Sequence, residues 1–173
     1  MDAVKPIVNK VAQSALITLA LETFFPKEEE IACIDLKDFL FRGLILREEE
    51  FRNAVKNKDW EEYRDKCVAI YCSSDAIIPM WAYMILSVSL SSIAKDVAAT
   101  APLQAPETFL LRNLIRLDAN LFQDKRVLVK GCGDRKISEA AFVQIADLLT
   151  PVVRSLMYGE ACSNVPIFKK ANQ

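Results

Sequence analysis

Three cysteines and three carboxylates stand in short polar loops of this chain; they are Cys72, Cys132, Cys162, Asp75, Asp134 and Glu160. Thiolates are the ligands that zinc and iron–sulfur centres favour, and three cysteines with one oxygen ligand would leave an exchangeable position on the metal. The set is our metal-site hypothesis, with zinc or an iron–sulfur cluster as the candidate cofactor. The chain has no CxxC pair, the close spacing that structural zinc sites usually show.

Two other uses of these cysteines stay open. Cys132 lies between two glycines, and the cations Lys130 and Arg135 stand close enough to lower the pKa of a thiol. Thiol-redox or sulfur-handling chemistry is therefore one alternative. The other is that the cysteines are small core side chains in a non-catalytic structural or interaction protein. We expect this packing role for Cys33 and Cys67, because free cysteine is among the most buried residue types.

Composition excludes several classes of function. The chain has 173 residues and no histidine, so it cannot hold a Ser-His-Asp or Cys-His catalytic pair or a histidine-ligated metal. Only four glycines are present, and no phosphate-binding motif of the GxGxxG or GxxxxGK[ST] type occurs. A net charge of −1 does not favour a nucleic-acid-binding face. Whether the protein is an enzyme stays open.

One uncharged segment tests the expectation of a cytoplasmic protein. No secretory signal opens the chain, so we expect the five cysteines to be thiols in the cytoplasm. Residues 76–94 carry no charge over 19 residues, which is near the length that spans a bilayer. Pro79 and four serines within this segment favour a buried helix, and we predict no membrane association.

The sequence also repeats itself. Residues 65–95 align without a gap on residues 124–154, at a shift of 59. The identical pairs are Asp65/Asp124, Lys66/Lys125, Val68/Val127, Asp75/Asp134, Ile78/Ile137, Ala82/Ala141 and Leu90/Leu149. The ungapped register indicates an internal duplication, with repeats at 47–100 and 106–159. In the counterpart of the uncharged segment, Glu139 and Asp147 also argue against a membrane span.

Both repeats predict the same order of elements. We expect a helix, a strand, a polar loop, a long helix and a second strand; these are 49–56, 67–71, 72–75, 79–95 and 96–100 in the first repeat, and 107–117, 126–130, 131–134, 138–154 and 155–158 in the second. A strand–helix–strand unit of this length is a right-handed crossover with parallel strands. The predicted fold class is α/β, with internally duplicated strand–helix–strand units on a mixed, partly parallel sheet.

The remaining segments complete the predicted domain. Residues 1–46 have no counterpart in the repeats and contain two expected strands, in ALITLALETF and EEIACIDLKDFLF. Residues 160–173 form a tail with a short strand or a frayed end. No Gly/Ser-rich linker interrupts the chain, so we expect 1–173 to be a single domain. Trp60 and Trp81 are expected in the core. Ligands of open α/β sheets bind at the carboxyl ends of strands, where the loops CSSD and GCGD stand.

Four motifs carry a family resemblance: DWEEYRDK, CSSDAIIPMWAYM, DKRVLVKGCGD and GEACSNVPIFKK. With them the chain resembles a family of bacterial proteins of unknown function, known chiefly from the Bacteroidetes group, over nearly its whole length. The resemblance implies no activity, cofactor or catalytic residue. Members of that family tend to lie near Suf-type iron–sulfur assembly components. Our leading hypothesis is therefore an accessory protein that binds a metal or an iron–sulfur species, with protein partners in iron–sulfur assembly and with a homo-oligomer as a further option.

Overall fold

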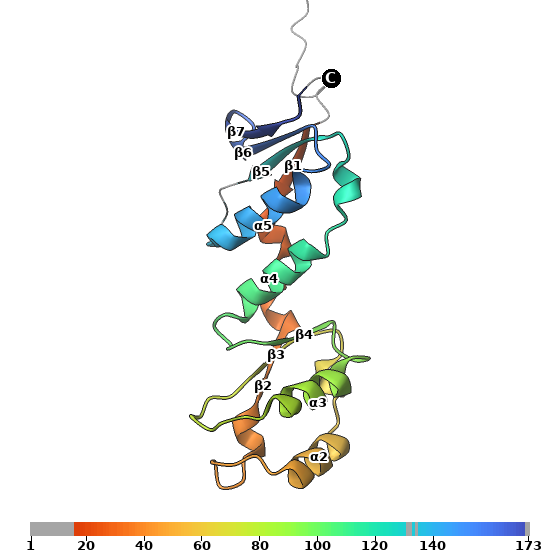
Figure 1. Ribbon diagram of the computed structural model, residues 1–173, viewed down its shortest axis with the longest axis vertical. Coiled ribbons are helices and arrows are strands. Elements are labelled where there is room, and N and C mark those ends of the chain that lie inside the picture. The colour runs from red at the N-terminus through yellow and green to blue at the C-terminus, as the bar shows by residue number, and fades with distance from the viewer. Residues whose placement is uncertain (1–15, 131–132, 134, 172–173) are drawn as a thin grey trace, which may run out of the picture. The chain divides into compact units, whose positions relative to one another are not determined.

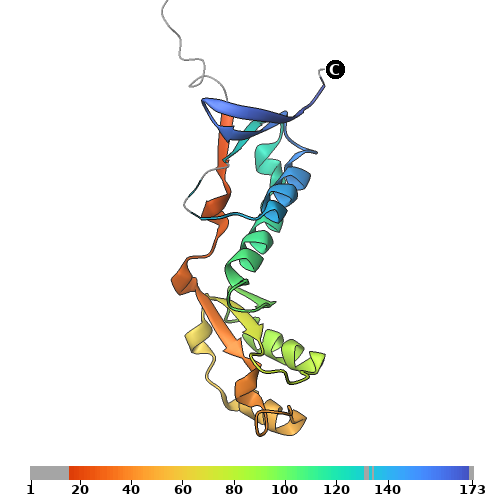
Figure 2. The same ribbon diagram turned by 90° about the vertical axis from the view of Figure 1, so that its left-hand side faces the viewer.

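The computed structural model describes residues 16–130, 133 and 135–171 (Figures 1 and 2). The chain divides into two compact units. Residues 24–113 form the first, which we call the inserted unit because it interrupts the other in sequence. Residues 1–23 and 114–173 form the second, the terminal unit.

The inserted unit is built on a parallel sheet. Its strands are β2 (Ile31–Asp35), β3 (Cys67–Tyr71) and β4 (Asp96–Ala99), in the order β2-β3-β4. The helices of this part of the chain are α2 (Glu48–Asn57), α3 (Met80–Leu90) and α4 (Ala105–Ile115). The 3₁₀ turns of the whole described chain are η1 (Leu21–Phe24), η2 (Glu28–Glu30), η3 (Leu36–Phe39), η4 (Glu61–Tyr63) and η5 (Ala119–Phe122).

Side-chain alternation divides the core of the inserted unit between the two faces of its sheet. Val68 and Ile70 of β3 pack with Phe51 of α2 and with α3 in one cluster. Cys67 and Ala69 point the other way and pack with α4. Strand β3 is therefore covered on both faces, which explains why its sequence is an apolar run without polar alternation.

The terminal unit carries a mixed sheet. Strands β1 (Leu16–Ala20), β5 (Arg126–Lys130) and β6 (Ser155–Glu160) are parallel, and β7 (Ser163–Lys169) pairs with β6 in the antiparallel sense. Helix α5 (Glu139–Leu149) joins β5 to β6. The hydroxyl of Ser138 caps its first turn by accepting a hydrogen bond from the amide of Ala141 at 3.3 Å.

The turns that lead into β3 and β5 have the same local geometry. Asp65 and Asp124 both adopt a positive φ, at 58° and 54°. The amide of Asp65 donates to the carbonyl of Ile93 at 3.0 Å, and the amide of Asp124 donates to Val152 at 2.9 Å. These aspartates are turn residues, as expected for side chains that tolerate the left-handed region. The internal duplication itself stays a prediction.

The α/β fold class, with strands both parallel and antiparallel, is confirmed. Strands 67–71 and 126–130 have the predicted bounds. The two long helices are shorter than predicted, because each ends in a turn, after residue 90 or residue 149, ahead of the basic residue that we had expected to close it. The strands also divide over two sheets.

The N-terminal segment contributes one strand to each unit, which the sequence did not indicate. Strand β1 pairs with β5 and β2 pairs with β3. Leu16 lies opposite Arg126 and Ile31 lies opposite Cys67, so β1 and β2 occupy equivalent places. Each unit thus contains three parallel strands in equivalent positions. The single-domain organisation stays a prediction.

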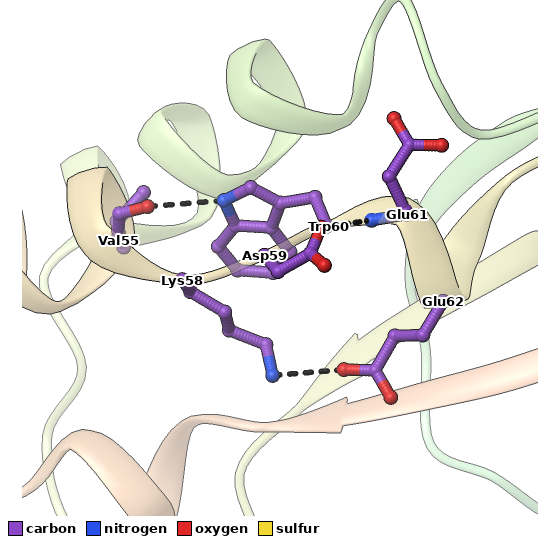
Figure 3. A network of polar contacts seen from close by, with 6 residues as sticks. All are labelled: Val55, Lys58, Asp59, Trp60, Glu61 and Glu62. Atoms are coloured by element: carbon purple, nitrogen blue, oxygen red, sulfur yellow. Dashed lines mark hydrogen bonds and ion pairs between the residues drawn. The ribbon is translucent and has the colours of Figure 1, made fainter.

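Trp60 shows how the inserted unit closes the end of α2 (Figure 3). Its side chain is buried, and its indole N–H donates to the carbonyl of Val55 at 3.0 Å. Around it, Lys58 pairs with Glu62 at 2.9 Å, and the Asp59 carboxylate accepts from the amide of Glu61 at 3.0 Å. The predicted core position of Trp60 is confirmed, while Trp81 is only half-buried against the same cluster.

Candidate functional site

In the inserted unit, the CSSD loop leaves the carboxyl end of β3 and is anchored by a carboxylate of the neighbouring strand. Asp35, the last residue of β2, accepts hydrogen bonds at 3.0 Å from the amides of Ser73 and Lys37. Within the loop, the Cys72 thiol and the Ser74 hydroxyl lie 3.4 Å apart. Cys72 is half-buried and Asp75 is exposed. The two predicted site residues of this loop therefore stand on a braced turn.

The Asp35 carboxyl is held in its charged form. Partial burial acts to raise its pKa, but the hydrogen bonds from Ser73, Lys37 and Tyr71 outweigh burial and lower the pKa below the usual range. The charged carboxylate accepts these bonds better than the protonated acid. The anchoring of the loop consequently depends on the ionisation of Asp35.

Cys72 and Asp75 line different cavities. Cys72 lies in a largely apolar cavity of about 530 Å³ with Tyr83, Met84 and Thr100. Asp75 lines a cavity of about 680 Å³, together with main-chain and side-chain atoms of residues 43–46. The thiol and the carboxylate therefore do not serve one shared pocket.

In the terminal unit, the turn between β6 and β7 carries Cys162, which is exposed. Glu160, at the end of β6, lies 3.9 Å from the ammonium of Lys130, at the end of β5. Cys132 and Asp134 follow β5 and lie outside the described residues. Val129 pairs with Tyr158, so Lys130, the last described residue before Cys132, lies beside the end of β6.

Among the glycines of these loops, the backbone requires Gly159, and Gly133 lies close to a carboxylate. Gly159 has a φ of 125°, and a Cβ there would come within 2.6 Å of the carbonyl oxygen of Ser163 across the hairpin. A Cβ on Gly133 would overlap the carboxylate of Glu22, which follows β1. Glu22 thus joins Glu160 and Cys162 at the carboxyl ends of the parallel strands in the terminal unit.

The cysteines differ in exposure. Cys67 is buried as predicted. The expected burial of Cys33 is wrong, since its side chain points away from the core cluster on the edge strand β2 and is exposed. Among the described residues, which omit Cys132 and Asp134, no three cysteine and carboxylate side chains converge so that they could hold a metal.

An apolar groove recurs in the two units, between the helix and the last parallel strand. In the terminal unit it is a cavity of about 380 Å³ lined by Phe142, Val143 and Tyr158, with Ile167 of β7 at one wall. The rings of Phe142 and Tyr158 meet edge to face, with centroids 5.5 Å apart. In the inserted unit the residues at the shift of 59, which include Tyr83, Met84 and Ala99, line two adjoining cavities.

Sequence reasoning missed both Asp35 and the grooves. The repeat alignment held a signal for the grooves, because Tyr83 and Met84 align with the apolar residues Phe142 and Val143. No such signal pointed to Asp35. It lies beside the CSSD loop because β2, and not β1, pairs with β3, and only the tertiary structure decides that pairing. The aspartates that the repeats share, by contrast, had drawn attention to Asp75.

A family profile described as "Protein of unknown function (DUF2480)" matches residues 5–170. The chain belongs to this family. No curated protein and no solved structure shows significant similarity to the chain. Among the described residues, no helix is both long enough and apolar enough to cross a membrane.

Proposed function

We propose that this member of the DUF2480 family is a non-catalytic binding protein whose helix–strand grooves hold apolar segments of partner molecules. The observation that carries the proposal is the recurrence of the same groove at equivalent positions of both units. Surface grooves with apolar walls and few polar groups are typical of binding sites. In the terminal unit, the aromatic pair Phe142 and Tyr158 offers the rigid contact area that dominates many interfaces.

Photo-crosslinking in cells that produce the protein naturally tests this proposal. A photoreactive phenylalanine analogue at Tyr158, on the groove wall, should yield discrete adducts with another molecule. The same analogue at Asn120, an exposed residue of η5, is the matched control and should yield none. No adduct from position 158, or equal adducts from both positions, would contradict the proposal.

A metal or iron–sulfur site is the second candidate, and the placement of Glu160 and Cys162 at the carboxyl end of β6 favours it. The ammonium of Lys130, the last described residue before Cys132 and Asp134, lies 3.9 Å from the carboxylate of Glu160. Two thiolates with carboxylates suit zinc or an iron–sulfur species. Metal binding by Cys72 and Asp75, in the inserted unit, stays a separate prediction.

Metal analysis and a visible spectrum of anaerobically purified protein test this candidate. If it holds, metal content falls in Cys132→Ser and Cys162→Ser but not in Cys33→Ser, which alters an exposed cysteine outside the predicted set. No bound metal and no uptake after reconstitution would overturn it. This candidate implies a cytoplasmic protein of a Bacteroidetes cell that acts with Suf-type iron–sulfur assembly components. Co-isolation with those components, lost in Cys162→Ser, would support it.

A further inference from the structure

Helix α3 presents an apolar face to solvent. Met80, Met84 and Val88 lie four residues apart along α3 and are 71%, 66% and 74% exposed. Ile77, in the non-helical segment just before the helix, is 92% exposed. The opposite face of the helix, with Ala82, Leu86 and Leu90, is fully buried in the core of the inserted unit. The stripe of exposed apolar side chains is therefore not part of the core of the inserted unit.

The equivalent face of the terminal unit is mostly charged. At the shift of 59 residues, the four positions are Lys136, Glu139, Val143 and Asp147, all of them exposed. Three of the four are charged there, whereas none is charged on α3. An exposed apolar patch of this kind marks an interaction surface.

We propose that this α3 face packs against the α3 face of a second copy of the chain, about a two-fold axis near Met84. The inference rests on the proposed binding function and names the partner for the inserted unit. In a two-fold interface only the residues close to the axis lie near their own symmetry mates, and like charges there would repel each other. Residues 76–94 contain no charged side chain, which suits such an interface.

The charges that flank the stripe favour an antiparallel arrangement of the two helices. Asp75 precedes α3 by five residues and Lys95 follows it by five residues. With the axis near the middle of the helix, Asp75 of one copy approaches Lys95 of the other. Asp75 is exposed, and Lys95 is half-exposed in its surface pair with Glu30. The antiparallel arrangement thus sets opposite charges against each other at both ends.

The apolar surface extends beyond the helix. Leu44 and Ile45, which are 71% and 61% exposed, share a cavity of about 680 Å³ with Ile77. The helical part from Met80 to Val88 spans only about 12 Å. A helix pair of this length covers less than the roughly 800 Å² per partner of a standard interface, so we expect a weak, reversible dimer.

Sedimentation velocity of the full chain, from micromolar to millimolar concentration, tests the proposal. The unaltered protein should show a monomer–dimer equilibrium. Met84→Glu should weaken the dimer at least about 100-fold, because each copy would bury an unpaired carboxylate near its symmetry mate. Val165→Glu, which adds the same charge at an exposed valine of β7 (58%) outside the grooves, should alter the Kd less than about twofold. Asp75→Lys should weaken the dimer about tenfold, with an effect that fades as salt is added.

Val88→Glu gives a second test of the same face, and unchanged thermal unfolding confirms that each variant is folded. A protein that stays monomeric throughout, or a dimer that survives Met84→Glu and Val88→Glu, would overturn the proposal. Crosslinking from Tyr158 probes the terminal unit and does not use the α3 face. Failure of the dimer therefore leaves a partner adduct at Tyr158 intact, and absence of that adduct leaves the dimer measurement intact.

Discussion

The two units protect the same edge of their sheets by different means. In the terminal unit, β7 pairs with the outer edge of β6. In the inserted unit, β4 is the last strand among the described residues, and alternate amides of β4 point away from β3. The amide of Val97, one of these, donates to the Asp96 carboxylate at 2.8 Å. A side chain in one unit thus takes the place of a strand in the other.

The Asp96 carboxylate can do this because Arg112 holds it. The guanidinium of Arg112, in α4, donates two hydrogen bonds to Asp96, at 2.8 and 2.7 Å, while the aspartate is 7% exposed. Open strand edges invite pairing with other chains, and a fixed carboxylate near the edge is one way to discourage it. Strands β4 and β6 therefore occupy equivalent places in their sheets but present different edges to the surroundings.

The largest expected losses of stability come from substitutions in the cores of the two units, at positions that match at the shift of 59 residues. Leu86→Ala and Ile145→Ala remove fully buried side chains at matching positions, and each should lower the free energy of unfolding by about 2–5 kcal/mol. We expect both variants to shift one common transition in urea, followed by circular dichroism. Strands β1 and β5 flank the inserted unit in sequence, so unfolding that unit adds loop-closure entropy to their pairing. Two separate transitions would contradict the single-domain prediction.

The next prediction concerns the two hydrogen bonds that Arg112 donates to Asp96. Arg112→Ala should cost about 3 kcal/mol, because the buried Asp96 carboxylate would lose the guanidinium that neutralises its charge. The double change Asp96→Ser with Arg112→Ala, which installs the residue that Ser155 provides in the terminal unit, should cost less than Arg112→Ala alone. Chemical denaturation measures both. A double variant less stable than Arg112→Ala would show that the unpaired charge is not the main penalty.

A smaller effect concerns the CSSD loop, which the Asp35 carboxylate anchors. Asp35→Ala should cost about 1–2 kcal/mol and speed amide exchange at Ser73, whereas Asp35→Asn keeps an acceptor and should cost less. The terminal unit has Ala20 at the equivalent place, so Ala20→Gly should leave the CSSD loop unchanged.

The same anchor predicts a pH dependence. Because the pKa of Asp35 is lower in the folded than in the unfolded chain, its contribution to stability is complete above the unfolded pKa of about 3.9. The contribution is lost as the pH falls through the lower, folded pKa. The amide resonance of Ser73 should titrate in that acidic range, and the titration should vanish in Asp35→Asn. A midpoint above that of an ordinary aspartate would contradict the assignment.

The smallest effects are expected to be equal in the two units. Asp65→Ala and Asp124→Ala should each cost about 1 kcal/mol, because alanine tolerates the left-handed region less well than aspartate. Asp65→Gly should change stability by less than about 0.5 kcal/mol, since relief of the backbone is offset by greater freedom of the unfolded chain. Thermal unfolding resolves these differences. Unequal costs for the two alanine variants would weaken the structural equivalence of the turns.

The pattern of residues was sufficient for the local elements. Strands 67–71 and 126–130 are short β-branched and apolar runs bounded by polar loops, and such signals act over a few residues. The cap at Ser138 and the aspartate turns are local in the same way. The positions of Cys72, Asp75 and Cys162 after strands could be predicted as well, because parallel strands are followed by loops at their carboxyl ends.

Tertiary structure alone decided which strands pair and which faces stay open. Nothing local in β1 and β2 states that one joins β5 and the other β3, since both segments are equally apolar and the pairing spans long stretches of chain. The exposure of Cys33 and of the stripe from Ile77 to Val88 follows from that pairing and from helix packing. An uncharged helix could equally have been buried on every side, and only its neighbours determine that one apolar face remains available for a partner.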